Sequence, residues 1–196
     1  MTKKIFLSLI LSFFTIISFS QEIIKVNTDA SSLIWTGYKL TSSHEGTIQL
    51  KSGELEIKDG KLVGGEFIID MTSIKNTDIE DEEYRDKLDK HLKDDDFFGV
   101  EKYSEAKLRI TKVIAPKTEG ENYQITADLT IKGITHSINF SSEVKINNDA
   151  FLATSTIKFD RTKWDIKYNS GSFFDDLGDY MILDEVQLKL FLLSEK

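Results

Sequence analysis

Apolar and polar residues alternate with a period of two along most of this chain, and this pattern constrains the fold more than any other feature. The stretch 123–131 is typical, because every second residue from Tyr123 to Ile131 is apolar. Successive side chains of a β-strand point to opposite faces, so such a stretch predicts a strand with one buried face. Several such strands in succession favour an antiparallel sheet whose apolar faces meet.

Eight stretches predict strands in this way. They are residues 32–41, 45–57, 62–71, 107–115, 122–131, 134–146, 151–159 and 181–193. In the second of them the apolar positions change from even to odd numbers at Ser52-Gly53, which predicts a β-bulge. Asp59-Gly60, Lys132-Gly133 and 147–149 predict turns. Eight antiparallel strands can close into an up-and-down barrel, although the pattern alone also allows a sandwich with a Greek key.

One helix, at about residues 79–93, interrupts this all-β pattern. Thr77 and Glu80 have the spacing of a capping box, and the acidic start and basic end of the segment suit the helix dipole. Tyr84, Leu88 and Leu92 form a single narrow apolar stripe. The sequence therefore predicts a helical insertion that lies as a lid against the β structure.

The overall charge of the chain excludes some classes of partner. The 196 residues carry a formal net charge of −8, and 40% of them are hydrophobic. This length and composition suit one folded domain with a real core. The negative charge argues against nucleic acid or an anionic membrane surface as a partner.

Residues 1–20 have the composition of a secretory signal peptide. Lys3-Lys4 is followed by an apolar run and then by Ser18-Phe19-Ser20 ahead of Gln21. A membrane anchor is the alternative, but the apolar run is short for a span. The chain has no cysteine, which excludes disulfides, a thiol nucleophile and a lipid-modified cysteine at the cleavage site. We therefore expect a single domain over residues 21–196, without a transmembrane span, that is periplasmic or secreted.

Short motifs before, within and after the helical segment resemble the YceI-like family. The matching segments include Asp70, Ser73-Ile74, Arg85-Asp86, His91-Leu92, Asp96-Phe97-Phe98 and Lys102-Tyr103, and then 128–135 and 159–164. The resemblance implies a bacterial, exported, lipocalin-like barrel that binds polyisoprenoids or similar lipids and often forms homodimers. The chain departs from the family pattern at Gly99, Ser104 and Asp165, where an acidic residue, a proline and a glycine are usual.

The candidate ligand-binding residues combine inward-facing positions of the predicted strands with positions from the family motifs. They are Trp35, His44, Phe67, Asp70, Leu92, Phe97, Phe98, Ala127, Phe140, Ala153, Arg161 and Trp164. Small residues on the apolar faces, such as Ala127 and Ala153, suggest an open lumen, or else they make room for aromatic rings from opposite strands. Arg161 either pairs with Asp70 or another acid, which we favour, or meets an anionic head group.

The remaining chemistry-bearing residues predict neither catalysis nor a metal site. His44, His91 and His136 lack the spacing of metal ligands, and we expect His136 to be a core histidine. The chain has no nucleophile motif of the G-x-S-x-G type and no glycine-rich phosphate loop. We therefore expect a barrel that binds and carries a long-chain apolar lipid, without a cofactor. The alternatives are an enzyme acting on isoprenoid lipids through His44, Asp70 or Arg161, and a ligand-free structural barrel.

The signal-peptide interpretation predicts the mass of the mature protein. Because cleavage follows small residues, the intact mass of protein recovered from its native host should correspond to a chain that begins at Gln21. Recovery of the full-length chain from the membrane fraction would contradict this prediction.

Overall fold

The computed structural model of the protein describes residues 21–118, 120–147 and 150–195. The predicted signal peptide and part of the predicted turn at 147–149 lie outside these ranges. Within them the chain forms nine strands and one α-helix. They are β1 (Glu22–Lys25), β2 (Ser32–Lys39), β3 (Ser43–Lys58), β4 (Lys61–Asn76), α1 (Glu82–Lys93), β5 (Glu105–Ile114), β6 (Tyr123–Ile131), β7 (Ile134–Asn147), β8 (Ala150–Asp160) and β9 (Ile182–Leu193).

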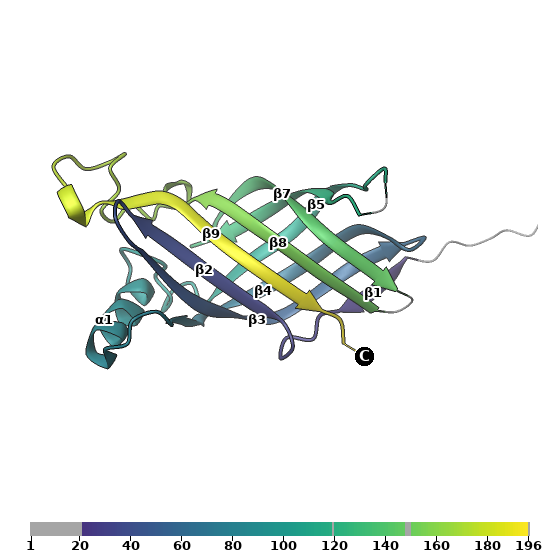
Figure 1. Ribbon diagram of the computed structural model, residues 1–196, viewed down its shortest axis with the longest axis horizontal. Coiled ribbons are helices and arrows are strands. Elements are labelled where there is room, and N and C mark those ends of the chain that lie inside the picture. The colour runs from purple at the N-terminus through teal and green to yellow at the C-terminus, as the bar shows by residue number, and fades with distance from the viewer. Residues whose placement is uncertain (1–20, 119, 148–149, 196) are drawn as a thin grey trace, which may run out of the picture.

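Strands β2 to β9 form a closed antiparallel barrel, as the sequence predicts (Figure 1). Each strand pairs with its sequence neighbours, and β2 pairs with β9 from Ser32↔Phe191 to Lys39↔Ile182, which closes the sheet on itself. This closure decides between the two architectures that the pattern left open, because a sandwich keeps two separate sheets. Short 3₁₀ helices, Arg161–Trp164 and Gly178–Tyr180, lie in the connection between β8 and β9.

All eight predicted strands are present, and the structure adds the four-residue strand β1. This strand is too short for its alternation to be seen in the sequence, and it pairs with the second half of β3. The hairpin turns at Asp59-Gly60 and Lys132-Gly133 are confirmed, with φ of 53° and 69° in the first and of 50° and 74° in the second. The register between β3 and β4 shifts between Leu50 and Ser52, so the bulge lies one residue earlier than predicted.

The helix begins at Glu82, later than predicted, and the proposed capping box does not form. Asp81 is the N-cap, and its side chain accepts a hydrogen bond from the backbone N–H of Tyr84. Thr77 cannot act as the cap because its backbone N–H donates to the carbonyl of Glu45, 2.9 Å away, which holds it beside β3. Neither α1 nor the 3₁₀ helices of the described ranges are long and apolar enough to cross a membrane.

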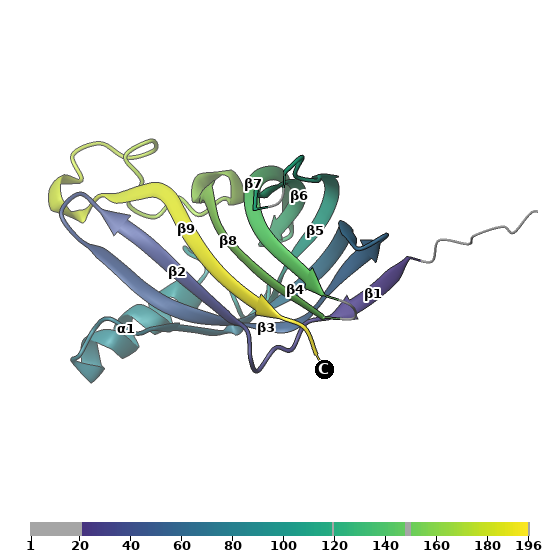
Figure 2. The same cartoon turned by 45° about the vertical axis from the view of Figure 1, so that its right-hand side comes forward.

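Helix α1 and the loop that follows it lie at one end of the barrel, and we call residues 82–100 the lid. The connection between β8 and β9 lies at the same end, whereas β1 and the C-terminal end of the chain lie at the other (Figures 1 and 2). Leu92 is buried and Leu88 packs against the core, but Tyr84 is 64% exposed. The predicted stripe therefore contributes two contacts rather than three, because Tyr84 turns outward, where Lys87 lies over its ring.

This packing predicts that the two ends of α1 differ in their effect on stability. Leu92→Ala should lower the free energy of unfolding by about 2 kcal/mol or more, since it removes a buried side chain. Tyr84→Ala is the matched control on the same helix and should change it by less than about 0.5 kcal/mol. Denaturant titration of both variants measures the difference. Equal, small effects would mean that the helix does not pack on the barrel.

Candidate ligand-binding site

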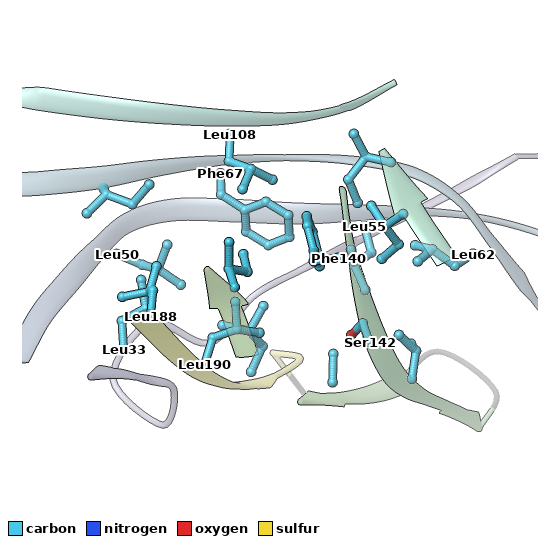
Figure 3. A pocket seen from close by; sticks show the side chains of 17 residues that line it. Leu33, Leu50, Leu55, Leu62, Phe67, Leu108, Phe140, Ser142, Leu188 and Leu190 are labelled. Atoms are coloured by element: carbon cyan, nitrogen blue, oxygen red, sulfur yellow. The ribbon is translucent and has the colours of Figure 1, made fainter. Parts of the chain in front are cut away.

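The inward-facing side chains leave two apolar cavities inside the barrel. We call the first the far chamber, because no residue of the lid contributes to its lining. Figure 3 shows the side chains that line it. Leu55, Leu62, Phe67, Phe140 and Leu190 are among the residues that line it. Ser142 supplies the one polar side chain of its described lining. This chamber can therefore hold hydrocarbon and offers a ligand very little hydrogen bonding.

The second cavity, the lid chamber, lies beneath the lid. The lid contributes Leu92, Phe97 and Phe98 to its wall, β2 contributes Trp35, and the connection between β8 and β9 contributes Arg161. About 130 Å³ of this chamber can be reached by the centre of a water molecule, against about 60 Å³ in the far chamber. Both volumes exceed the roughly 10–15 Å³ that a single buried water needs.

The two chambers lie next to each other inside the barrel, and we call them together the lumen. Ile69, Leu108, Ile157 and Leu188 line both of them and form a belt on β4, β5, β8 and β9. A well-packed protein core has few voids larger than a water molecule. The barrel therefore encloses two adjacent apolar spaces that its own side chains do not fill.

Eight of the twelve predicted site residues line this lumen. In the far chamber they are Phe67, Phe140 and Ala153, and in the lid chamber they are Trp35, Leu92, Phe97, Phe98 and Arg161. The alternation in the sequence placed the strand residues on the inward face, and the family motif identified those of the lid.

His44, Asp70, Ala127 and Trp164 lie outside both chambers, so the structure does not support a direct ligand contact for them. His44 Nδ1 lies 3.0 Å from Asp78 Oδ2 and holds the segment between β4 and α1 against β3. Burial raises the pKa of Asp78, but hydrogen bonds from Glu45 N–H, Asn76 and His44 outweigh this and hold it below its ordinary value. The contact between His44 and Asp78 is therefore structural.

The other three residues contact other parts of the protein instead of lining a chamber. Asp70 Oδ1 accepts hydrogen bonds from the backbone N–H and the hydroxyl of Thr72, at 2.9 and 2.6 Å. Ala127 is fully buried among its neighbours. Trp164 is also fully buried, and its Nε1 donates to the carbonyl of Leu129 at 3.1 Å. Their positions follow from orientation and packing, which strand alternation alone does not specify.

Arg161 is buried and is held by main-chain carbonyls. Its Nε, Nη1 and Nη2 donate to the carbonyls of Leu183, Ile166 and Ile182 at 3.2, 2.8 and 2.9 Å. Its acidic partner is Asp184, with Nη2 and Oδ1 3.5 Å apart, and not Asp70. Burial lowers the pKa of Arg161, while Asp184 and Asp160 oppose the change. The expected structural bridge is therefore present, with a different acid and with carbonyls as the main partners.

The three histidines have separate partners. His91 Nε2 lies 2.9 Å from Asp96 Oδ2, and its ring packs edge-on against Phe97 and Tyr168. His136 is exposed, so the prediction of a core histidine is wrong: its Nε2 contacts the carbonyl of Lys163, and its ring packs on Trp164. Its side chain covers the outside of Trp164 at the end of the barrel.

Sequence reasoning did not single out the belt residues or Ser142 as ligand contacts. Leu108 and Leu188 lie on predicted strands and on their apolar faces, so the alternation contained this signal. Which inward residues lie at the centre of the lumen depends on the register between strands, and the pattern of a single strand does not contain it.

Comparisons with known proteins agree with this geometry. The family model for the YceI-like domain matches residues 25–192. A UPF0312 protein of Photorhabdus laumondii is 46% identical over 56 residues, which cover 29% of this chain and 28% of that one. A UPF0312 protein of Vibrio parahaemolyticus is 30% identical over 130 residues, which cover 63% of this chain and 62% of that one. The match thus spans less than two thirds of the length of either relative.

Two solved structures share the fold. BcnA of Burkholderia cenocepacia has a TM-score of 0.67 at 21% identity, covering 87% of this chain and 99% of that one. A polyisoprenoid binding domain from Saccharophagus degradans, implicated in plant cell wall breakdown, has a TM-score of 0.63 at 16% identity, covering 90% and 99%. At these identities the likeness shows the fold alone.

The bonding of Arg161 predicts a large structural effect of its removal. Arg161→Leu should lower the free energy of unfolding by about 3 kcal/mol or more, because it leaves buried carbonyls and Asp184 without their partner. Lys158→Leu is the control, since Lys158 pairs with Glu185 on the exposed surface; it should change the free energy of unfolding far less, because exposed ion pairs contribute little. Chemical denaturation of both variants compares them, and a mild effect of Arg161→Leu would contradict a structural role.

Proposed function

Since this chain belongs to the YceI-like domain family, we propose that it binds a long-chain apolar lipid, a polyisoprenoid or a similar amphiphile, in the lumen of its barrel. The protein carries or sequesters this lipid outside the cytoplasm and does not change it chemically. One observation carries the proposal, namely that the barrel encloses two adjacent apolar chambers with four aliphatic side chains in common. Unfilled apolar space suits a hydrocarbon chain, whose burial is favourable by about 0.8 kcal/mol per methylene group.

The shape of the lumen favours a linear ligand over a compact one. The lid chamber and the far chamber follow each other along the barrel and meet at Leu108 and Leu188. An eight-stranded barrel has an interior that side chains can fill or that can hold one small ligand. The polyisoprenoid binding domain from Saccharophagus degradans has the same fold, and this supports an isoprenoid chain as the ligand.

The arrangement of polar groups favours carriage over catalysis. An enzyme acting on the lipid through His44, Asp70 or Arg161 needs these groups to converge on the reacting atoms. His44 and Asp70 lie outside both chambers, and each nitrogen of Arg161 donates to a main-chain carbonyl. The described lumen thus presents a surface for binding rather than an acid–base pair.

The location of this activity rests on the sequence. Residues 1–20 have the order of charged, apolar and small residues that directs export. A carrier in an aqueous compartment outside the cytoplasm gives an apolar lipid a route that does not expose its chain to water. We therefore place the proposed function in the periplasm or outside the cell.

Native mass spectrometry tests the proposal directly. Protein purified without detergent from its native host should carry a mass increment that organic extraction removes and that lipid analysis identifies as a long-chain lipid. Ligand-free protein should then bind a prenyl lipid at a ratio of one to one. Absence of both the increment and the binding would refute the proposal and favour a ligand-free structural barrel.

Replacing alanine by phenylalanine should have different effects at two positions of the barrel. Ala153 lines the far chamber, whereas Ala127 is fully buried outside it. Ala153→Phe should weaken lipid binding while the melting temperature of ligand-free protein changes little, because the ring enters empty space. Ala127→Phe should lower the free energy of unfolding by about 1–3 kcal/mol through overpacking. Equal destabilisation by both substitutions would show that the lumen is already filled.

A further inference from the structure

Exposed apolar side chains gather on one side of the lid end of the barrel, and we call them the portal surface. They are Leu40 in the turn between β2 and β3, Leu183 in β9, and Phe173, Phe174 and Tyr180 in the connection between β8 and β9. Lys39 pairs with Ile182, and both views place the hairpin of β2 and β3 beside this connection (Figures 1 and 2). Single exposed apolar residues are common on proteins, whereas a group of them marks an interaction site.

The aromatic part of the portal surface is held in a defined position. Ser170 is fully buried, and its carbonyl accepts hydrogen bonds from the backbone N–H groups of Phe173 and Phe174 at 3.1 and 3.0 Å. The hydroxyl of Ser172 donates to Asp184 Oδ2 at 2.6 Å, which connects this loop to β9 next to Leu183. The two phenylalanine rings are therefore half exposed on a turn that the rest of the protein holds in place.

The portal surface includes part of the wall of the lid chamber. Leu183 lines this chamber and is nevertheless 38% exposed, which makes it the most exposed residue in the described lining. Gly37 also lines the chamber, and a Cβ atom added there would have no heavy atom within 4 Å. At this place the wall of the lid chamber is thus thin and loosely packed.

The pairing of β2 with β9 is irregular at the same place. On β2 a single residue, Tyr38, separates two successive pairs, whereas on β9 residues 183–185 separate them. The carbonyl of Leu183, the first of these residues, accepts a hydrogen bond from Nε of Arg161 at 3.2 Å. An opening at Leu183 would therefore leave the regular ladder between the two strands in place.

The charges beside the portal surface indicate which partner fits it. Three acidic residues lie in the same loop, namely Asp175, Asp176 and Asp179, and the segment 170–181 contains no lysine or arginine. Lys167, whose Nζ lies 4.9 Å from the centre of the Phe173 ring, is paired with Asp165 at 2.7 Å. The carboxylates would repel an anionic bilayer, and a symmetric contact between two copies would bring them together.

A zwitterionic bilayer suits both the charges and the rings. The outermost charge of a phosphatidylcholine or phosphatidylethanolamine head group is its cationic amine, which is attracted to carboxylates. Aromatic and aliphatic side chains bind at the boundary between head groups and acyl chains, where their apolar parts leave water. The portal surface combines these two kinds of group in one loop.

We propose that the portal surface binds a zwitterionic lipid bilayer and that the carried lipid passes between the bilayer and the lid chamber past Leu183. Phe173 and Phe174 enter the head-group region, while the neighbouring carboxylates stay at its surface beside the amines. Binding in this orientation places the thin wall of the lid chamber against the bilayer, so the hydrocarbon chain crosses without meeting water. This inference rests on the proposed lipid-binding function and adds to it the route of the lipid and the partner that exchanges it.

A single labelled cysteine tests the contact with the bilayer, because the chain has no cysteine of its own. Phe174→Cys, labelled with an environment-sensitive fluorophore, should emit at shorter wavelength on phosphatidylcholine vesicles, since the label leaves water. Vesicles that contain phosphatidylglycerol should give a smaller shift at low ionic strength. Ile114→Cys is the matched control and should not shift, because Ile114 is similarly exposed but ends β5, which runs away from the lid.

Transfer kinetics test the route of the lipid. Phe173→Ser/Phe174→Ser should slow uptake of a fluorescent polyprenol analogue from phosphatidylcholine vesicles about tenfold, since the rings no longer enter the bilayer. Its Kd for the same probe delivered from cyclodextrin should stay unchanged, because neither ring lines a chamber. Ile23→Ser/Ile114→Ser, which replaces two exposed apolar residues at the other end of the barrel, should alter neither quantity.

The outcomes separate this inference from the proposed function. If wild-type protein binds no polyprenol analogue from cyclodextrin, the lipid-binding function itself fails. If it binds the probe but the label at position 174 does not shift on phosphatidylcholine vesicles, the function stands and the bilayer is refuted as the partner, in favour of a protein. Unchanged uptake by the folded double phenylalanine variant would refute the route past Leu183. A larger shift on anionic vesicles would refute the preference for zwitterionic lipid, and melting temperatures identify any variant that is not folded.

Discussion

Closure of the sheet through the pairing of β2 with β9 is the constraint on which the rest of the structure depends. A sheet that closes on itself has no free edge, and in this barrel the apolar faces of the strands point inward. In this chain the enclosed side chains are mainly leucine, isoleucine and phenylalanine, and they do not fill the interior. The same pairing therefore provides the stability of the fold and the space in which a ligand can lie.

The two ends of the barrel are built differently. At one end the lid places Leu92, Phe97 and Phe98 over the lumen. At the same end Arg161 donates hydrogen bonds to three main-chain carbonyls in the connection between β8 and β9 and at the start of β9. A buried guanidinium with well-placed acceptors fixes several chain segments at once. This end of the protein thus combines an apolar cover with a rigid polar anchor at Arg161.

The strands and the hairpin turns at Asp59-Gly60 and Lys132-Gly133 could be predicted from the sequence, because each strand keeps one apolar face and the hairpins carry their characteristic residues. The pattern alone left a barrel and a sandwich open, and only the family resemblance favoured the barrel. The helix was predicted, but its start was not, since Thr77 bonds to β3 instead of capping the helix. Eight of the predicted site residues line the lumen. His44 and Asp70 do not, because contacts between distant segments decide where a polar side chain points. His136 lies opposite Leu129, on the face that the alternation predicts, but it is exposed.

The first strand has a consequence for the connectivity of the fold. Val26 and Ser194 form a β-bridge, and the backbone N–H of Glu195 donates to the carbonyl of Lys25 at 2.8 Å. The end of β1 and the last described residues thus lie side by side, toward the end of the barrel away from the lid (Figure 1). Closely spaced termini are what make circular permutation tolerable. A short peptide could join them here, and new ends could be opened in the hairpin at Lys132-Gly133, so the barrel could be displayed or fused in an orientation that its natural connectivity does not allow.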